Sequence, residues 1–185
     1  MAEHPEELGW VRRAQAGDRT AFASLVDRYW ERLRRWLFAL SGNEHVAEDM
    51  TQEAFTRAWA ALPRLQAEVR FQPWLFRIAR NCLLDSRRGQ RGIPPRPLPE
   101  QLEQPGEGPL GKLLEQEAHQ AVQAALERLP ETYRSAYLLW TQADLPYSEI
   151  AQVLSITEET ARWRVFKARQ YLLNELRPYL AVPEP

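Results

Sequence analysis

The sequence predicts an all-α protein built from two small helical domains that a proline-rich linker joins. Apolar residues recur at helical spacing from about residue 8 to 88 and again from about 113 to 177, and alternating strand-like patterns are nearly absent. Between these stretches, residues 91–109 contain six of the fourteen prolines and three glycines. Proline fixes φ and lacks a backbone donor, so no helix can run through this segment. We therefore expect a first domain over 1–90, a flexible acidic linker over 91–112 and a second domain over 113–180.

Four helices are predicted in the first domain: a short one that ends near residues 17–18, and others over about 20–40, 44–62 and 72–88. Ser41 and Gly42 end the second helix, because glycine readily adopts the left-handed conformation that closes helices. The third helix repeats apolar residues with the i, i+3, i+4 rhythm of a buried face, at Ala47, Met50, Ala54, Ala58 and Ala61. The fourth helix is expected to bury Leu75, Ile78, Ala79 and Cys82.

The second domain is predicted to contain helices over about 113–128, 131–142, 148–154 and 158–176. Leu129 and Pro130 close the first of them. Residues 155–157 form a short turn, in which Thr157 can cap the N-terminus of the last helix. Two helices joined by such a turn are typical of a helix-turn-helix motif, which places its second helix in the major groove of DNA.

Composition excludes several classes of protein. Hydrophobic residues make up 44% of the 185 residues, so there is enough apolar surface for a folded core. No apolar run approaches the ~18–20 residues of a membrane span, and the charged start Met1-Ala2-Glu3-His4 is unlike a signal peptide, so we expect a cytoplasmic protein without membrane insertion. The single Cys82 and the scattered His4, His45 and His119 predict no internal disulfide, no metal site and no cofactor.

The net charge of -1 conceals a strong local asymmetry. Residues 77–91 carry five arginines against Asp85, and residues 160–170 carry Arg162, Arg164, Lys167 and Arg169 with no acid. Acidic residues gather in 98–117 and in an earlier cluster of Glu44, Glu48, Asp49 and Glu53. Basic and acidic faces indicate two kinds of partner, one of them a polyanion.

The third helix carries one acidic, amide-bearing surface opposite its core face. Asp49, Gln52, Glu53 and Thr56 fall within about 100° of one another on a helical wheel. Carboxylates on an exposed helix have neither a pocket nor an evident partner that shifts their pKa, so we predict no catalytic residue and no enzyme. The residues by themselves leave open a solvated face or a docking surface for a basic protein.

The fourth helix and the residue before it combine arginines with aromatic rings and an amide, at Phe71, Trp74, Phe76, Arg77, Arg80, Asn81, Arg87 and Arg88. Unpaired bases stack on aromatic rings while arginines hold the phosphate backbone, so the pattern favours single-stranded DNA. Trp74 and Phe76 sit at core-like spacing, which is more often a sign of packing. Phe71, just before the helix, is the better stacking candidate.

The last helix is predicted to pack through Ala161, Val165, Ala168 and Leu172. The candidate contacts with duplex DNA are Thr160, Arg162, Trp163, Arg164, Phe166 and Lys167. Cations suit phosphates and the other side chains can meet base edges. A solvated basic face is the alternative, and the aromatic rings could instead pack against another helix. A solvated face rarely exposes Trp and Phe together, which favours DNA binding.

Several segments together resemble one protein family. The stretch AEDMTQEAFTRAW over 47–59, followed by WLFRIARN over 74–81, closely resembles region 2 of extracytoplasmic-function sigma factors. Gly17 and Asp18, with Ala21, Phe22 and Tyr29, fit the opening segment of that family. Leu129-Pro130, then YSEIA over 147–151 and the basic segment 160–169, are similar to region 4. Both domains match in order, with the linker between them.

The resemblance implies a sigma factor that binds core RNA polymerase and directs promoter-specific transcription initiation. It implies that Asp49, Gln52, Glu53 and Thr56 dock on the coiled coil of the largest polymerase subunit. The loop over 65–72 and the helix bearing Asn81 would capture a flipped base of the melted minus-10 element, with arginines on phosphates. The helix from Glu158 would bind the duplex minus-35 element and touch the polymerase flap. The linker would thread toward the RNA exit channel, and an anti-sigma factor would be a further partner.

Two departures from the family pattern concern promoter preference. The loop residues 66–70 lack the common glycine, and Trp163 and Phe166 stand where smaller or polar residues are frequent. The preferred bases therefore cannot be carried over. The chain stops at Pro185, so we expect no additional C-terminal domain.

The main alternative is a stand-alone helix-turn-helix repressor or activator, which binds duplex DNA without polymerase. That function leaves the surfaces of the third and fourth helices unexplained. A helical adaptor that binds only protein is a third possibility, against which the basic last helix with Trp163 weighs.

Overall fold

The computed structural model describes residues 5–66, 70–89 and 120–180, and every regular element in these ranges is helical, which confirms the all-α prediction. The elements are α1 (Pro5–Gln15), α2 (Arg19–Ser41), α3 (Glu44–Ala61), the 3-10 turn η1 (Leu62–Arg64), α4 (Phe71–Gly89), α6 (Glu131–Thr141), α7 (Tyr147–Leu154) and α8 (Glu158–Leu180). Residues 120–128 are also helical. The predicted linker over 91–112 and the start of the helix predicted over 113–128 lie outside the described residues.

The predicted boundaries between α1, α2 and α3 rest on side-chain caps and one glycine. The Asp18 carboxylate accepts hydrogen bonds from the backbone N–H groups of Thr20 (2.9 Å) and Ala21 (3.1 Å) and so caps α2. Gly42 ends α2 with a φ of 67°, in the left-handed region where a side chain would be strained. Asn43 then caps α3 by accepting a hydrogen bond from the Val46 N–H at 3.2 Å.

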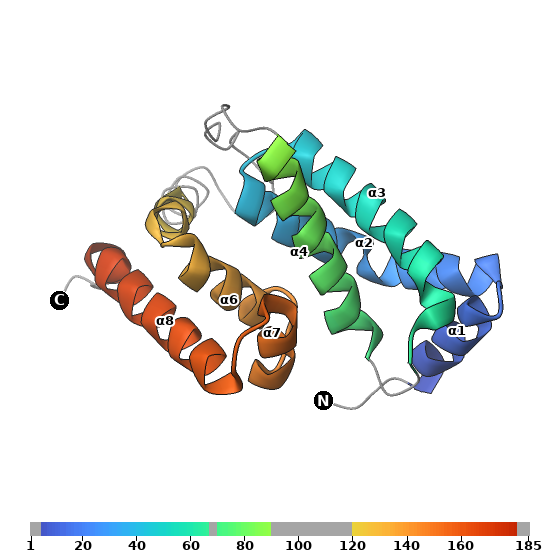
Figure 1. The fold of residues 1–185 in the computed structure, drawn as a ribbon. Helices are drawn as coiled ribbons and strands as arrows, with labels where there is room; N and C mark the ends of the chain where they lie inside the picture. Colours follow the sequence, from blue (N-terminus) through green and yellow to red (C-terminus); the bar gives the residue numbers. More distant parts are fainter. Residues whose placement is uncertain (1–4, 67–69, 90–119, 181–185) are drawn as a thin grey trace, which may run out of the picture.

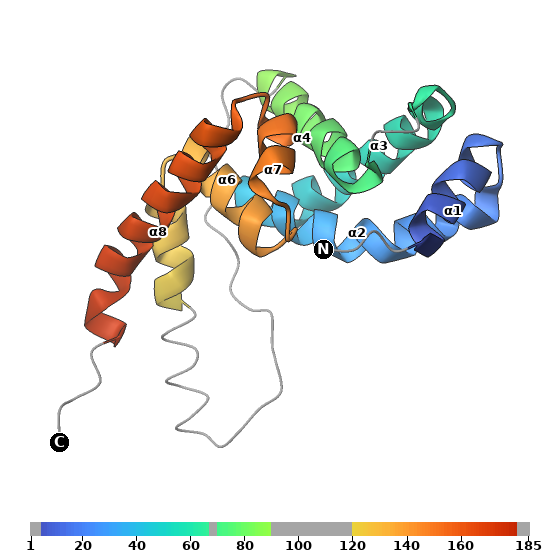
Figure 2. The same cartoon turned by 90° about the horizontal axis from the view of Figure 1, so that it is seen from below.

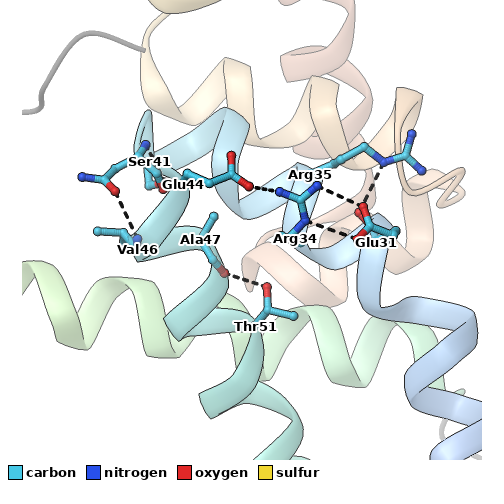
Figure 3. Close-up of polar contacts among 9 residues, drawn as sticks. Glu31, Arg34, Arg35, Ser41, Glu44, Val46, Ala47 and Thr51 are labelled. Atoms are coloured by element: carbon cyan, nitrogen blue, oxygen red, sulfur yellow. Dashed lines mark hydrogen bonds and ion pairs between the residues drawn. The ribbon is translucent and has the colours of Figure 1, made fainter. Parts of the chain in front are cut away.

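An arginine ties the end of α2 to the start of α3. Arg34 lies between Glu31 on its own helix, at 3.1 Å, and Glu44 in the first turn of α3, with which it also forms an ion pair (Figure 3). Two turns further along α3, the buried Thr51 hydroxyl donates to the Ala47 carbonyl at 2.7 Å, so this polar group is satisfied within the helix (Figure 3). These contacts fix the turn between α2 and α3 and therefore the direction of the α3 surface.

The core of α1 to α4 follows the predicted periodicity with one exception. Ala47, Ala54 and Ala58 are fully buried, and these small side chains let α3 pack closely on its neighbours. The prediction for Ala61 is wrong: it is exposed, because α3 ends there and Leu62 of η1 is buried instead. In α4 the predicted Leu75, Ala79 and Cys82 are buried and Ile78 is half-buried.

The second group of helices packs directly on the first. Figures 1 and 2 show α6 and α7 beside α4, with α8 on the outer side, and one hydrophobic cluster runs through both groups of helices. The Gln72 amide donates to the Ala143 carbonyl at 2.6 Å, and Arg87 pairs with Glu131 at 2.6 Å. Arg70 forms an ion pair with the buried Glu149 of α7. The sequence predicts two domains, but this contact between them was not predicted.

Candidate functional site

A helix-turn-helix positions α8. After α7, Ser155 adopts the left-handed conformation with a φ of 56°, which reverses the chain in a short turn. The Thr157 hydroxyl then accepts a hydrogen bond from the Thr160 N–H at 3.2 Å and caps α8, as predicted. The buried faces of both helices share the core, so the outer face of α8 is presented in a fixed direction.

The predicted division of α8 into a packing face and an outer face is confirmed. Ala161, Val165, Ala168 and Leu172 are buried. On the outer face, 48% of Trp163 and 53% of Phe166 is exposed. With Glu159, Thr160 and Arg162, these two rings line a concavity of the surface. Trp163 touches one ring of the neighbouring α6, that of Tyr133, so the alternative of packing against another helix holds in part for Trp163. Both rings nevertheless keep about half of their surface exposed.

The cations of α8 are held by local contacts. Arg162 pairs with Glu158 at 3.0 Å and its guanidinium lies 5.4 Å from the centre of the Tyr147 ring. The Lys167 ammonium lies 5.8 Å from the centre of the Trp163 ring. Arg164 is half-buried. An exposed ion pair such as Arg162–Glu158 contributes little to stability, so phosphate contacts can replace it at little cost.

Thr160 has a different position from the other residues predicted to contact duplex DNA. Its side chain is half-buried, and its hydroxyl lies 2.8 Å from that of Thr157. It therefore belongs to the cap of α8. Arg169, which was not among the predicted contacts, is exposed with its guanidinium 5.3 Å from the centre of the Trp140 ring. Arg169 lies in the run of cations over 160–170, and this is the sequence signal that predicts it as a further DNA contact.

On α4, three of the predicted minus-10 residues share one exposed face. Arg77, Asn81 and Arg88 are exposed and lie within about 40° of one another at 100° per residue. Arg80 is half-buried and lies to one side of this face. Arg87 instead holds the structure together, because it donates to the Leu40 carbonyl at 2.7 Å and pairs with Glu131. Part of the predicted loop, residues 67–69, lies outside the described residues.

The prediction that Phe71 stacks on a base is wrong in this structure. Phe71 is the first residue of α4 and only 2% of it is exposed. Its ring centre lies 5.7 Å from that of Tyr29 and 5.7 Å from that of Trp74, so it is part of the core of the first domain. The core interpretation of Phe76 is confirmed, since it is fully buried against Trp36 with ring centres 5.3 Å apart.

The acidic surface of α3 is present as predicted, and one of its residues, Glu53, is already in an ion pair. Asp49, Gln52 and Thr56 are exposed. The half-buried Glu53 pairs with Arg57 at 2.6 Å, and Arg57 also pairs with Asp85 of α4 at 3.3 Å. The hydrogen bond from Arg57 to Glu53 raises the pKa of Arg57 above its usual value. Arg57 therefore links α3 to α4 and Glu53 holds Arg57 from its own helix, while Asp49 and Gln52 are the more accessible groups.

The described residues contain no cluster of three or more His, Cys, Asp or Glu side chains that suits a metal ion. Over the same part of the chain, no helix combines the length and the apolar character that crossing a bilayer requires.

The fold and these surfaces define a class: all-helical proteins that carry a helix-turn-helix with a basic, aromatic outer face. Comparison with family models gives the family. The Sigma-70 region 2 model matches residues 25–93, and the Sigma-70, region 4 model matches residues 119–172. The chain belongs to the extracytoplasmic-function (ECF) sigma factors of the sigma-70 family.

Relatives match along nearly the whole chain. The ECF RNA polymerase sigma-E factor of Escherichia coli (strain K12) is 31% identical over 192 residues, covering 97% of this chain and 99% of that protein. The ECF RNA polymerase sigma factor SigW of Bacillus subtilis (strain 168) is 29% identical over 177 residues, covering 90% and 95% of the two chains. The solved structure of CnrH in complex with the cytosolic domain of CnrY has a TM-score of 0.71 at 24% identity, covering 94% of this chain and 98% of that chain, which shows a common fold.

Proposed function

We propose that this sigma factor binds core RNA polymerase through α3 and directs promoter-specific transcription initiation through α4 and α8. Residues 1–90 form the domain for polymerase and the minus-10 element, 91–112 the linker, and 113–180 the domain for the minus-35 element. One observation carries the proposal: a chain of the sigma factor family exposes an acidic surface on α3 and two basic surfaces, on α4 and α8. The acidic surface suits a basic protein, and the basic surfaces suit DNA.

The acidic surface of α3 is suited to a basic protein. Asp49 and Gln52 are exposed on rigid helical backbone, and Glu53 keeps its carboxylate in place through Arg57. Opposite charges on two protein surfaces speed their encounter and fix their orientation. The coiled coil of the largest polymerase subunit is the proposed partner of this surface.

The two DNA surfaces differ in a way that fits two states of the promoter. Arg77, Asn81 and Arg88 on α4 offer cations and an amide, which suit a strand whose bases have left the duplex. The outer face of α8 follows a helix-turn-helix and suits the major groove of intact duplex at the minus-35 element. The chemistry of this chain is binding, with the catalytic step carried out by polymerase.

The proposal includes regulation by a protein partner. The structural relatives CnrH and the sigma factor RpoE of Bartonella quintana were solved in complex with CnrY and with the anti-sigma factor NepR, respectively. By analogy with these complexes, we assign an anti-sigma factor as a further partner. The match of the second domain to sigma-70 region 4 supports the polymerase flap as another proposed partner. Because its partners are polymerase and promoter DNA, the proposed site of action is the cytoplasm.

Run-off transcription with bacterial core RNA polymerase, on fragments from upstream of the gene for this protein, tests the proposal. Discrete transcripts that require the protein are expected. Asp49→Lys combined with Glu53→Lys should abolish both the transcripts and co-purification with core polymerase. Asp27→Lys, which reverses an exposed acid on α2, is the matched control and should retain both. Circular dichroism establishes that the variants are folded.

Either of two results would overturn the proposal. Unchanged co-purification of the double variant would remove the α3 surface from polymerase binding. Duplex binding by the wild type without transcription or association with polymerase would favour the stand-alone regulator.

A further inference from the structure

The outer face of α8 carries a stripe in which apolar rings lie between polar ends. Glu159, Trp163, Phe166 and Gln170 follow one another at spacings of three or four residues and so lie along one line of the helix. Both rings are about half exposed. A large exposed aromatic pair on a rigid helix indicates a surface that is covered in a complex.

Cations flank this stripe on both sides. At 100° per residue, Arg162 and Arg169 fall along one edge of the stripe, and Arg164 and Lys167 along the other. The major groove has the matching layout, because its floor of base edges is bounded on both sides by phosphates. This arrangement favours duplex DNA over a protein partner as the occupant of the face.

The rings are held in position before any ligand arrives. The Tyr133 ring meets Trp163 edge to face, with ring centres 5.6 Å apart and planes at 72°. The Lys167 ammonium also lies near the Trp163 ring, 5.8 Å from its centre. Phe166 comes three residues further along and is the more exposed of the two. Little conformational freedom is therefore lost when Trp163 is covered.

Only one group on the major-groove edges of the four bases is apolar. Thymine presents its C5-methyl group, whereas the other three bases present only hydrogen-bond donors and acceptors. A phenyl ring cannot satisfy those polar groups, so its burial against them is costly. We propose that Phe166, supported by Trp163, recognises thymine C5-methyl groups in the upstream duplex element of the promoter. This inference rests on the proposed function and specifies which base the α8 face selects.

The test uses polymerase reconstituted from bacterial core enzyme and the full chain. Promoter fragments with a randomised upstream element are selected for transcription by wild type, Phe166→Ala and Trp163→Ala. Thymine should be enriched by wild type at positions where Phe166→Ala shows no preference. Leu173→Ala is the matched control, because Leu173 is 52% exposed on the same helix but lies two turns beyond Phe166. It should select the same sequences as the wild type.

Replacing those thymines by uracil then removes only the methyl group. Each methyl buried against the ring should be worth about a fourfold difference in affinity for wild-type polymerase. Phe166→Ala polymerase should bind the thymine and uracil fragments equally.

Equal binding of thymine and uracil fragments by the wild type would overturn the inference, while transcription from both would leave the proposed function intact. The inference would also be overturned if Phe166→Ala kept the sequence preference of the wild type and associated more weakly with core polymerase. That result would mean that a protein, and not DNA, covers this face of α8. Absence of any protein-dependent transcript would instead overturn the proposed function and, with it, this inference.

Discussion

Arg70, just before α4, forms an ion pair with Glu149 on α7, across 79 positions of the sequence. Glu149 is only 5% exposed, so its charge is buried in the contact between the two domains. Gln72 and Arg87 add hydrogen bonds from α4 to the second domain. In this structure the helix-turn-helix domain thus packs against the start of α4, the helix proposed to bind the minus-10 element.

The two proposed DNA elements are too far apart for this arrangement. Elements about 25 base pairs apart are separated by roughly 80 Å along B-form DNA, at 3.4 Å per base pair. Here α4 packs on α7 and α7 packs on α8, and the axes of helices that pack directly lie about 8–10 Å apart, so α4 and α8 are separated by only two such steps. Simultaneous binding of both elements therefore requires the domains to separate, and the Arg70–Glu149 pair must then break.

Arg70→Ala should weaken the contact between the domains. Without Arg70, the Glu149 carboxylate is left buried with less compensation, which typically costs about 1–3 kcal/mol. We expect a larger radius of gyration in small-angle scattering and faster proteolysis between the domains. Arg77→Ala, at an exposed position of the following helix α4, is the control and should match the wild type. An unchanged radius of gyration for Arg70→Ala would show that the pair does not hold the domains together.

Arg162→Ala should weaken binding to duplex DNA and reduce its dependence on salt. Each lost phosphate contact lowers the slope of log K against log salt concentration by about one unit. The measurement is a salt titration of the full chain on a duplex that carries its minus-35 element. Arg177→Ala, an exposed cation in the last turn of α8, should leave the slope unchanged. A slope equal to that of the wild type would remove Arg162 from the phosphate contacts.

Leu172→Ala should destabilise the second domain by about 2–5 kcal/mol, because it leaves a cavity in a small core. Leu172 is buried with Ala125, Leu129 and Ala168, and the methyl groups of the two alanines are too short to fill the space. The neighbouring Leu173→Ala should change stability by less than about 0.5 kcal/mol, because Leu173 is exposed. Urea titrations followed by circular dichroism measure both. Equal effects of the two substitutions would contradict the packing of α8.

Asp18 should make the stability of the first domain depend on pH. Hydrogen bonds from the Thr20 side chain, the Ala21 backbone and Arg13 lower the pKa of Asp18 well below its usual value. Because the folded pKa is lower than the unfolded one, this stabilisation is present above about pH 4 and is lost as the pH falls through the folded pKa.

Asp18→Ala should therefore lower the melting temperature at neutral pH. Asp18→Asn should lower it less, because asparagine also caps helices but lacks the charge. The advantage of the wild type over Asp18→Asn should shrink between about pH 4 and pH 2 in thermal melts followed by circular dichroism. An advantage that does not change over that range would show that the carboxylate charge is not what stabilises the cap.

Most of the helices and the nature of each surface could be predicted from the sequence, because both are properties of local spacing. In α3, alanines one or two helical turns apart, at 47, 54 and 58, indicate the buried face. In α8, helical spacing puts Val165 and Leu172 on the buried face and Trp163 and Phe166 on the exposed one. The turn between α7 and α8 and its Thr157 cap are equally local, since capping joins residues within one helical turn.

The tertiary structure decided which side chains are available. Its place just before the predicted helix makes Phe71 a stacking candidate in the sequence, but packing against Tyr29 buries it. Arg87 had the pattern of a phosphate contact, yet it binds Glu131 and the Leu40 carbonyl. No local pattern in the sequence predicts the Arg70–Glu149 pair, because the two residues are 79 positions apart. Periodicity identifies the face of a helix that is buried, whereas the partner of that face is set by the docking of segments far apart in the chain.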